Sequence, residues 1–177
     1  YSVIDAVKGM KDVRVNLIGD GNELRNLRSY IFTNKISNVF IHGKLRWMRT
    51  IPYYQTSDLL FASLKAGFDT AIPSKLYEYL STGLPVIYQG SGAAADLLFN
   101  FGNTFIYSGD DAKELEKIIW KIKRLSPART VKNIQIIRNS FIREKLSLRF
   151  VELSAKLLNE KTLSDVFVED YLLSTEH

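Results

Sequence analysis

The sequence has no cysteine among its 177 residues and only two histidines, His42 and His177. A chain without cysteine has no disulfide framework and no thiolate metal site, and two isolated histidines do not make a histidine-based metal site. A Ser-His-Asp arrangement would have to use His42, and no nucleophile-elbow motif accompanies it. We therefore expect no metal site and name no catalytic residue.

Long apolar runs are also missing, since no run reaches the length of a membrane span. The net charge is +5, from 24 basic and 19 acidic residues, which is a mild excess. It favours a phosphate-bearing ligand or an anionic membrane face. No nucleic-acid-binding motif is present, so we expect no nucleic-acid partner. Together with the lack of cysteine, this composition predicts a cytoplasmic protein, at most peripheral at the inner face of a membrane.

Short apolar segments alternate with helical patterns along most of the chain. The predicted strands cover residues 13–18, 38–42, 59–62, 86–88 and 104–107, and the predicted helices cover residues 23–33, 51–56, 75–82, 93–99 and 111–125. We expect Thr50 to cap the second helix, with Pro52 in its first turn, and residues 108–110 to cap the last. Strands joined by short helical connections predict the α/β class, with a parallel sheet covered by helices on both faces.

The two ends of the chain differ from this pattern. Residues 1–10 resemble the end of a helix already under way, so we expect the chain to be a piece of something longer. After residue 125 the sequence is helical in character, with helices expected at about 129–144 and 148–159. We predict a domain over residues 1–158 and an amphipathic helical tail over residues 159–177.

The stretch DTAIPSKLYEYLSTGLP, residues 69–85, is the strongest candidate for chemistry. A loop ends at Pro73 and Ser74, and we expect Ser74 to cap a helix that begins at Lys75 and Leu76. The start of such a helix lies at the carboxyl edge of an open sheet, where its N–H groups attract phosphate. Lys75 adds a mobile cation there, and Glu78 can accept hydrogen bonds from two neighbouring sugar hydroxyls. Considered alone, each of Lys75 and Glu78 can also be interpreted as an ordinary helix residue that faces solvent.

Two glycine loops are expected at the same edge. Gly19 and Gly21 form a Gly-x-Gly turn between the first strand and its helix, but Leu24 stands where a dinucleotide site has its third glycine. We interpret the turn as a strand-to-helix connection beside a ligand. Gly43 and Lys44 follow the second strand in the same way.

Four segments together resemble the nucleotide-sugar-binding half of retaining GT-B glycosyltransferases, in the large family that builds bacterial lipopolysaccharide, capsule and glycolipid chains. These segments are VNLIGDGNELRNL, NVFIHGKL, YYQTSDLLFASL and IPSKLYEYLSTGLPVI. The resemblance covers residues 1–158 and is most specific in the last segment. It implies a Rossmann-like C-terminal half of a GT-B fold and an N-terminal acceptor domain that this chain lacks.

The resemblance also implies roles for the residues above. Glu78 matches the second of two family glutamates, the one that binds the ribose hydroxyls, and Lys75 matches a cation near the diphosphate. The predicted donor-binding set is Gly19, Gly21, Gly43, Lys44, Pro73, Ser74, Lys75, Leu76 and Glu78. The implied reaction moves a sugar from a nucleoside diphosphate sugar, UDP more than GDP, to a hydroxyl of a lipid-linked or polysaccharide acceptor, without metal or other cofactor.

The sequence departs from the family in two places. The first family glutamate falls at position 70, which is Thr70 here, with Asp69 beside it as a candidate substitute. The family's first strand, with its phosphate-binding cation, would precede Tyr1. We therefore expect the chain alone to transfer nothing. Two alternatives stay open: a nucleotide-sugar epimerase of the same architecture, and a non-catalytic module that kept the fold.

Overall fold

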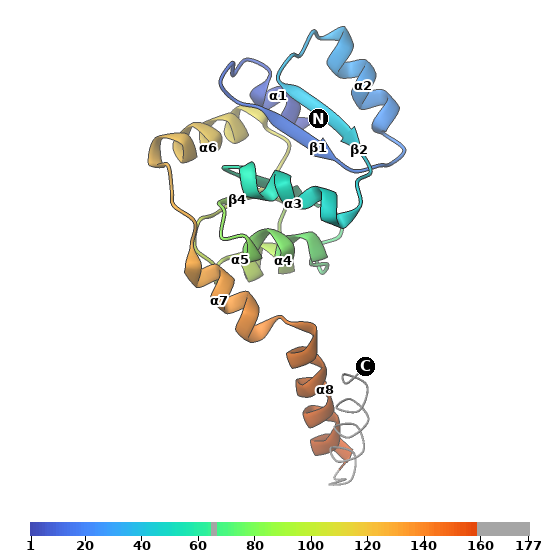
Figure 1. Ribbon diagram of the computed structural model, residues 1–177, viewed down its shortest axis with the longest axis vertical. Coiled ribbons are helices and arrows are strands. Elements are labelled where there is room, and N and C mark those ends of the chain that lie inside the picture. The colour runs from blue at the N-terminus through green and yellow to red at the C-terminus, as the bar shows by residue number, and fades with distance from the viewer. Residues whose placement is uncertain (65–66, 159–177) are drawn as a thin grey trace. The chain divides into compact units, whose positions relative to one another are not determined.

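The computed structural model describes residues 1–64 and 67–158, and by compactness the chain divides into two units, Tyr1–Asn133 and Ile134–His177. The first unit alternates helices and strands (Figure 1). Its elements are α1 (Ser2–Val7), β1 (Val15–Ile18), α2 (Leu24–Thr33), β2 (Val39–Gly43), α3 (Trp47–Thr56), β3 (Leu60–Ser63), α4 (Ser74–Ser81), β4 (Val86–Gln89), α5 (Ala93–Leu98), β5 (Thr104–Tyr107) and α6 (Ala112–Leu125).

All of the strand pairs in the described residues are parallel, which confirms the α/β class. The strands fall into two parallel sheets: β1 pairs with β2, and β3, β4 and β5 form a second sheet in that order. β4 has a neighbour on each side and is buried along its whole length, whereas β1 and β3 are partly exposed. Each of these two strands pairs on one edge only within the described part of the chain.

A shared apolar core nevertheless joins the two sheets. Ile87 of β4 packs in one cluster with residues of α1, β2, β5 and α6, and with partly buried side chains of β1 and β3. Side chains alternate along a strand, so Val86 and Tyr88 point to the opposite face. α4 contacts β3 and α5 contacts β5, and their buried side chains, such as Leu76, Leu80 and Leu98, cover that face. Helices therefore flank the strands on both faces, as predicted.

Two predicted helix starts were wrong. α3 begins at Trp47, four residues before the predicted start, and the Thr50 hydroxyl donates to the Trp47 carbonyl at 2.6 Å instead of capping the helix. Pro52 consequently lies inside α3, where its missing N–H removes one helical hydrogen bond. α4 begins at Ser74 with Pro73 as its N-cap and no side-chain cap. Proline fits there because its fixed φ suits an extended residue entering a helix.

The cap of α6 also lies one residue later than predicted. Asp111 is the N-cap, and its carboxylate accepts a hydrogen bond from the Lys113 amide at 2.8 Å. The preceding Asp110 accepts from the side-chain amide of Gln89 at 2.6 Å and so connects the helix start to the end of β4.

α7 (Val131–Ser140) begins in the first unit and continues into the second, which also contains α8 (Arg143–Leu158). The helical character after residue 125 is confirmed, but the break falls at residues 141–142 instead of 145–147. The tail over residues 159–177, and the boundary predicted before it, lie outside the described residues. None of the described helices has the length and apolar content needed to cross a membrane.

Asn38 holds the connection between α1 and β1. Its side-chain amide donates to the carbonyls of Val7 at 2.8 Å, Met10 at 3.0 Å and Val13 at 3.0 Å. Asn38→Asp replaces this donor with an acceptor that faces three carbonyl oxygens, and we expect a loss of about 3 kcal/mol of stability. Urea denaturation measures the loss, and the exposed Asn22→Asp serves as the control. Equal midpoints for the two variants would contradict this role.

A pH dependence follows from Asp5 on α1. Hydrogen bonds from Lys8 at 2.8 Å and from the Tyr30 hydroxyl at 2.6 Å lower the pKa of the Asp5 carboxyl. A lowered folded-state pKa stabilises the fold above the unfolded pKa of about 3.9, and this contribution is lost as the pH falls through the folded value. We expect Asp5→Asn to be less stable than wild type at pH 6 and to lose less stability between pH 5 and pH 2. Parallel curves from thermal denaturation would refute this assignment.

Candidate functional site

The candidate site is centred on Glu78, one turn into α4. Its side chain is 34% exposed, and its Oε2 atom accepts hydrogen bonds from Lys75 Nζ at 2.8 Å and from the Tyr54 hydroxyl at 3.1 Å. Both donors bind the same oxygen, and no hydrogen bond to Oε1 is found within the described residues. The carboxylate is thus oriented by protein on one side and keeps an acceptor for a hydroxyl ligand on the other.

The surroundings of Glu78 keep both donors protonated at neutral pH. Burial raises the pKa of Tyr54, and the Glu78 charge adds to this effect. Burial acts to lower the pKa of Lys75, but the hydrogen bond to Glu78 and the nearby negative charge outweigh it, so that the pKa is raised. Tyr79, whose ring packs edge-on against Tyr54 with centroids 5.8 Å apart, has its pKa raised by burial to about 12. Tyr54 therefore stays a donor and Lys75 stays a cation.

The start of α4 has two backbone N–H groups without a protein acceptor in the described residues. The Leu76 amide donates to the Pro73 carbonyl at 3.0 Å, and the Leu76 side chain is fully buried. The amides of Ser74 and Lys75 have no acceptor in the described ranges. These two N–H groups at the positive end of the helix can bind an anion. The Lys75 ammonium was expected to stand free beside them, but it is paired with Glu78.

The loop before α4 is attached to the start of α5. The Asp69 carbonyl accepts from the Ala93 amide at 2.7 Å, and the Asp69 carboxylate accepts from the Ser91 hydroxyl at 2.9 Å. Gly92 makes this contact possible: its φ is +69°, and a Cβ there would lie 2.1 Å from the Asp69 carbonyl oxygen. The second glycine of the Gly-Ser-Gly segment thus sets where the loop carrying Thr70 and Pro73 runs.

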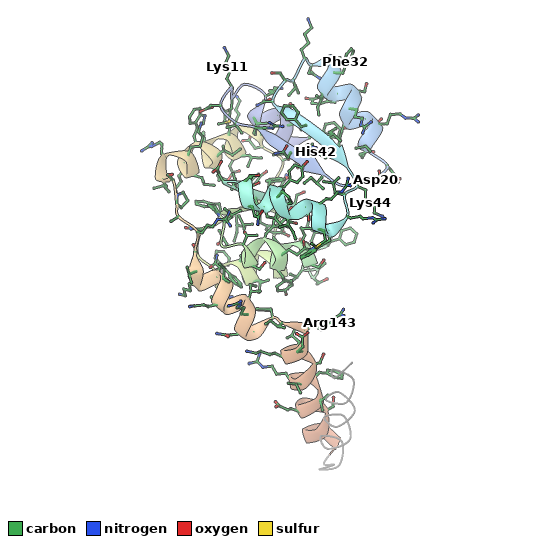
Figure 2. The ribbon with its side chains drawn as sticks, viewed as in Figure 1. Lys11, Asp20, Phe32, His42, Lys44 and Arg143 are labelled. Carbon is green, nitrogen blue, oxygen red and sulfur yellow. The ribbon has the colours of Figure 1, made fainter. Side chains whose placement is uncertain are left out.

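The two glycine loops meet at the ends of β1 and β2. The Gly19 amide donates to the Gly43 carbonyl at 2.9 Å, and Gly43 has a φ of +70°. A Cβ placed on Gly19, Gly21 or Gly43 meets nothing within 4 Å, so open space lies in front of this edge. Figure 2 shows Lys44 and Asp20 projecting at this same end of the strands.

His42 connects this edge to α3. Its Nδ1 lies 3.2 Å from the Tyr53 hydroxyl and its Nε2 lies 2.9 Å from the Asn16 side-chain oxygen. An amide oxygen can only accept, so Nε2 carries the proton and Nδ1 accepts from Tyr53. Both ring nitrogens are therefore used in holding α3 to β1 and β2, which makes His42 a structural residue here.

The predicted set thus falls into two groups. Gly19, Gly21, Gly43 and Lys44 border the first sheet, and Pro73, Ser74, Lys75, Leu76 and Glu78 form the start of α4. No hydrogen bond joins the two groups among the residues described, but α3 connects them, because it follows the Lys44 loop and carries Tyr54 to Glu78. Sequence reasoning placed Tyr54 in a helix and gave it no role.

A second residue that the sequence analysis missed is Arg129. Its guanidinium donates to the carbonyls of Tyr54 at 3.3 Å, Gln55 at 3.0 Å and Thr82 at 3.3 Å. The carbonyls at a helix end have no helical partner, so one side chain satisfies the ends of α3 and α4 together. No periodicity signals such a contact, because Arg129 lies 74 positions from Gln55.

No group of three or more histidine, cysteine, aspartate or glutamate side chains that could hold a metal occurs in the part of the chain that the structure describes. The described site offers an oriented carboxylate, two helix-start amides and several exposed cations beside an open edge, and each of these groups can bind a polar or anionic ligand.

Comparison with known proteins identifies the family. Residues 2–124 match the model of the glycosyl transferases group 1 family, while no curated protein matches the chain. A glycosyltransferase from Rickettsia africae ESF-5 has a similar structure, with a TM-score of 0.68 and 18% identity over 89% of this chain and 44% of that one.

Anabaena HepE, solved in complex with UDP and glucose, is also similar, with a TM-score of 0.57 and 20% identity over 78% of this chain and 43% of that one. The chain therefore spans less than half the length of either solved relative. At these identities the two structures show the fold, which is that of GT-B glycosyltransferases, and the family match covers more than two thirds of the sequence. The chain belongs to the glycosyl transferases group 1 family.

Proposed function

We propose that this chain is the donor-binding half of a retaining glycosyltransferase and that it binds a nucleoside diphosphate sugar at the start of α4. The observation that carries the proposal is the half-exposed Glu78 carboxylate, held through Oε2 by Tyr54 and Lys75. A carboxylate with a fixed direction and a free oxygen accepts hydrogen bonds from the adjacent hydroxyls of a ribose. The complex of a structural relative, HepE, with UDP and glucose supports UDP as the nucleotide.

The diphosphate of the donor binds beside the ribose in this proposal. The Ser74 and Lys75 amides point toward the carboxyl edge, and the positive end of the α4 dipole favours an anion there. Lys75 is 48% exposed, so its ammonium can leave Glu78 for a phosphate oxygen once ribose hydroxyls occupy the carboxylate. This exchange keeps Glu78 saturated while it brings a cation to the leaving group, which needs no metal to be neutralised.

The acceptor lies outside this chain in the proposal. The chain covers less than half of each solved relative, and a further domain would bind the hydroxyl acceptor, on a lipid-linked or polysaccharide chain in cell-surface synthesis. The reaction would then occur in the cytoplasm, at the inner face of the membrane. Alone, the 177-residue chain binds donor and transfers nothing.

One observation favours a second candidate, a module that binds donor without turnover. Thr70 has no carboxylate, and Asp69 is held to the start of α5 through its carbonyl and one carboxylate oxygen, so this loop offers a donor sugar only the second carboxylate oxygen of Asp69. Measurement of sugar transfer by a chain extended to the length of the solved relatives separates the candidates. Transfer that depends on Glu78 supports the enzyme, and UDP binding without transfer supports the module.

Removal of the Glu78 charge tests donor binding directly. Hydrogen bonds to a charged group contribute about 1.5–3 kcal/mol, so we expect Glu78→Gln to weaken UDP binding about tenfold to a hundredfold in isothermal titration calorimetry. Glu116→Gln, at a partly exposed position of α6, is the matched control and leaves the affinity unchanged. UDP affinity equal in both variants would rule out Glu78 as the ribose ligand, and no saturable heat for wild type up to millimolar UDP would rule out the site.

A substitution at Lys75 tests whether its ammonium moves from Glu78 to a phosphate oxygen when the donor binds. Lys75→Met keeps the length of the side chain and removes its charge. We expect it to weaken UDP about tenfold while the affinity for uridine, which lacks the diphosphate, stays the same or rises, because Glu78 loses a competitor. Competition against a labelled UDP analogue measures both ligands. Equal losses for UDP and uridine would mean that Lys75 only orients Glu78.

A further inference from the structure

Trp47 is a large apolar side chain that the fold leaves 61% exposed, although it lies on the inward side of its helix. The inward positions of α3 follow helical spacing from Trp47 through the buried Thr50 and the half-buried Ile51 to Tyr54. Tyr54 lies two turns after Trp47 on the same side, and its hydroxyl contacts Glu78. Trp47 is therefore exposed because it extends beyond the protein body, not because it faces away from it.

The position of Trp47 along α3 places it over the proposed donor site. Seven residues separate Trp47 from Tyr54, or roughly 10 Å along a helix, whereas four separate Ser74 from Glu78, or roughly 6 Å. Both helices begin at the carboxyl edge, and the Tyr54 hydroxyl contacts the Glu78 carboxylate. The start of α3 thus extends on the order of one turn past the start of α4, and helical side chains lean toward the N-terminus. An indole at this start of α3 is within reach of a ligand whose ribose binds the free oxygen of Glu78.

The surroundings of Trp47 are cationic. Lys44, Arg46 and Arg49 are exposed, and none of them has an ion pair among the described residues. Asp20 is the acidic residue that Figure 2 shows near Lys44. An exposed aromatic ring among unpaired cations matches a ligand that combines a flat apolar group with negative charge, since bases stack on aromatic rings and phosphates bind cations.

We infer that the Trp47 indole is the stacking platform for the nucleobase of the donor. The inference rests on the proposed function, because Glu78 must hold the ribose for the attached base to reach Trp47. A base joined to that ribose lies within one sugar's width of Glu78, on the side where α3 extends past α4. Stacking tolerates any base, so the platform adds affinity for the nucleoside without choosing between uracil and guanine.

The chain contains two tryptophans, Trp47 and Trp120, which allows a direct optical test. In Trp120→Phe, emission excited at 295 nm comes from Trp47 alone. We expect UDP to quench this emission and inorganic pyrophosphate, which has no base, to leave it unchanged. Trp47→Phe, whose emission comes from Trp120 on α6, is the matched control and shows no response to UDP.

Affinity supplies the second measurement. We expect Trp47→Ala to weaken UDP about tenfold in calorimetry, Trp47→Phe to retain most of the affinity because it keeps a ring, and Met48→Ala, at the next exposed apolar position, to match wild type. Since Trp47 is exposed, circular dichroism of the variants should equal that of wild type.

The outcomes separate this inference from the proposed function. UDP binding in calorimetry with no quenching of Trp47 and no loss in Trp47→Ala overturns the platform and leaves the donor site standing. An absence of UDP binding to the wild-type chain overturns both. Quenching by pyrophosphate as strong as by UDP assigns the signal to charge beside the indole, and this also overturns the platform.

Discussion

The hydrogen bond from the Tyr54 hydroxyl to Glu78 joins the two helices that flank the candidate site, and the other features of the site depend on it. It orients the Glu78 carboxylate and connects α3 to α4. Lys75 donates to the same carboxylate oxygen. Arg129 reinforces this arrangement from the opposite ends of the two helices. A site of this kind is positioned by neighbouring helices and requires no rigidity in the loops themselves.

The two halves of the candidate site lie on different sheets, so strand pairing alone does not fix their relative position. β1 and β2 hold the glycine loops, and β3 holds the loop that leads to α4, yet no backbone pairing links the two sheets in the described residues. What holds them together is apolar packing against α1 and α6, with α3 bridging the edge through Tyr53, His42 and Tyr54. The hydrophobic effect is non-directional, so the polar contacts of α3 give the edge its geometry.

The sequence was a good guide wherever the pattern was local. Short apolar segments located the five strands of the described residues, and Gly83 marked the end of α4, because these signals depend on neighbouring residues. Helix starts were less predictable: Thr50 is a good capping residue by composition, but it lies inside α3, where its hydroxyl donates to the Trp47 carbonyl. Pro73, and not Ser74, is the N-cap of α4. Glu78 was identified by its motif, whereas Tyr54 and Arg129 act across long separations that no single-sequence pattern encodes.

The contact between Gly92 and Asp69 has a consequence for how this protein can change over time. Every codon change that replaces a glycine adds at least one carbon, and at Gly92 that carbon would lie 2.1 Å from a carbonyl oxygen, far inside the van der Waals contact distance. The backbone must then move, and with it the loop that leads to α4. Substitutions that change the ligand preference of such a protein are therefore expected at the exposed side chains around the contact between Gly92 and Asp69, and not at Gly92 itself.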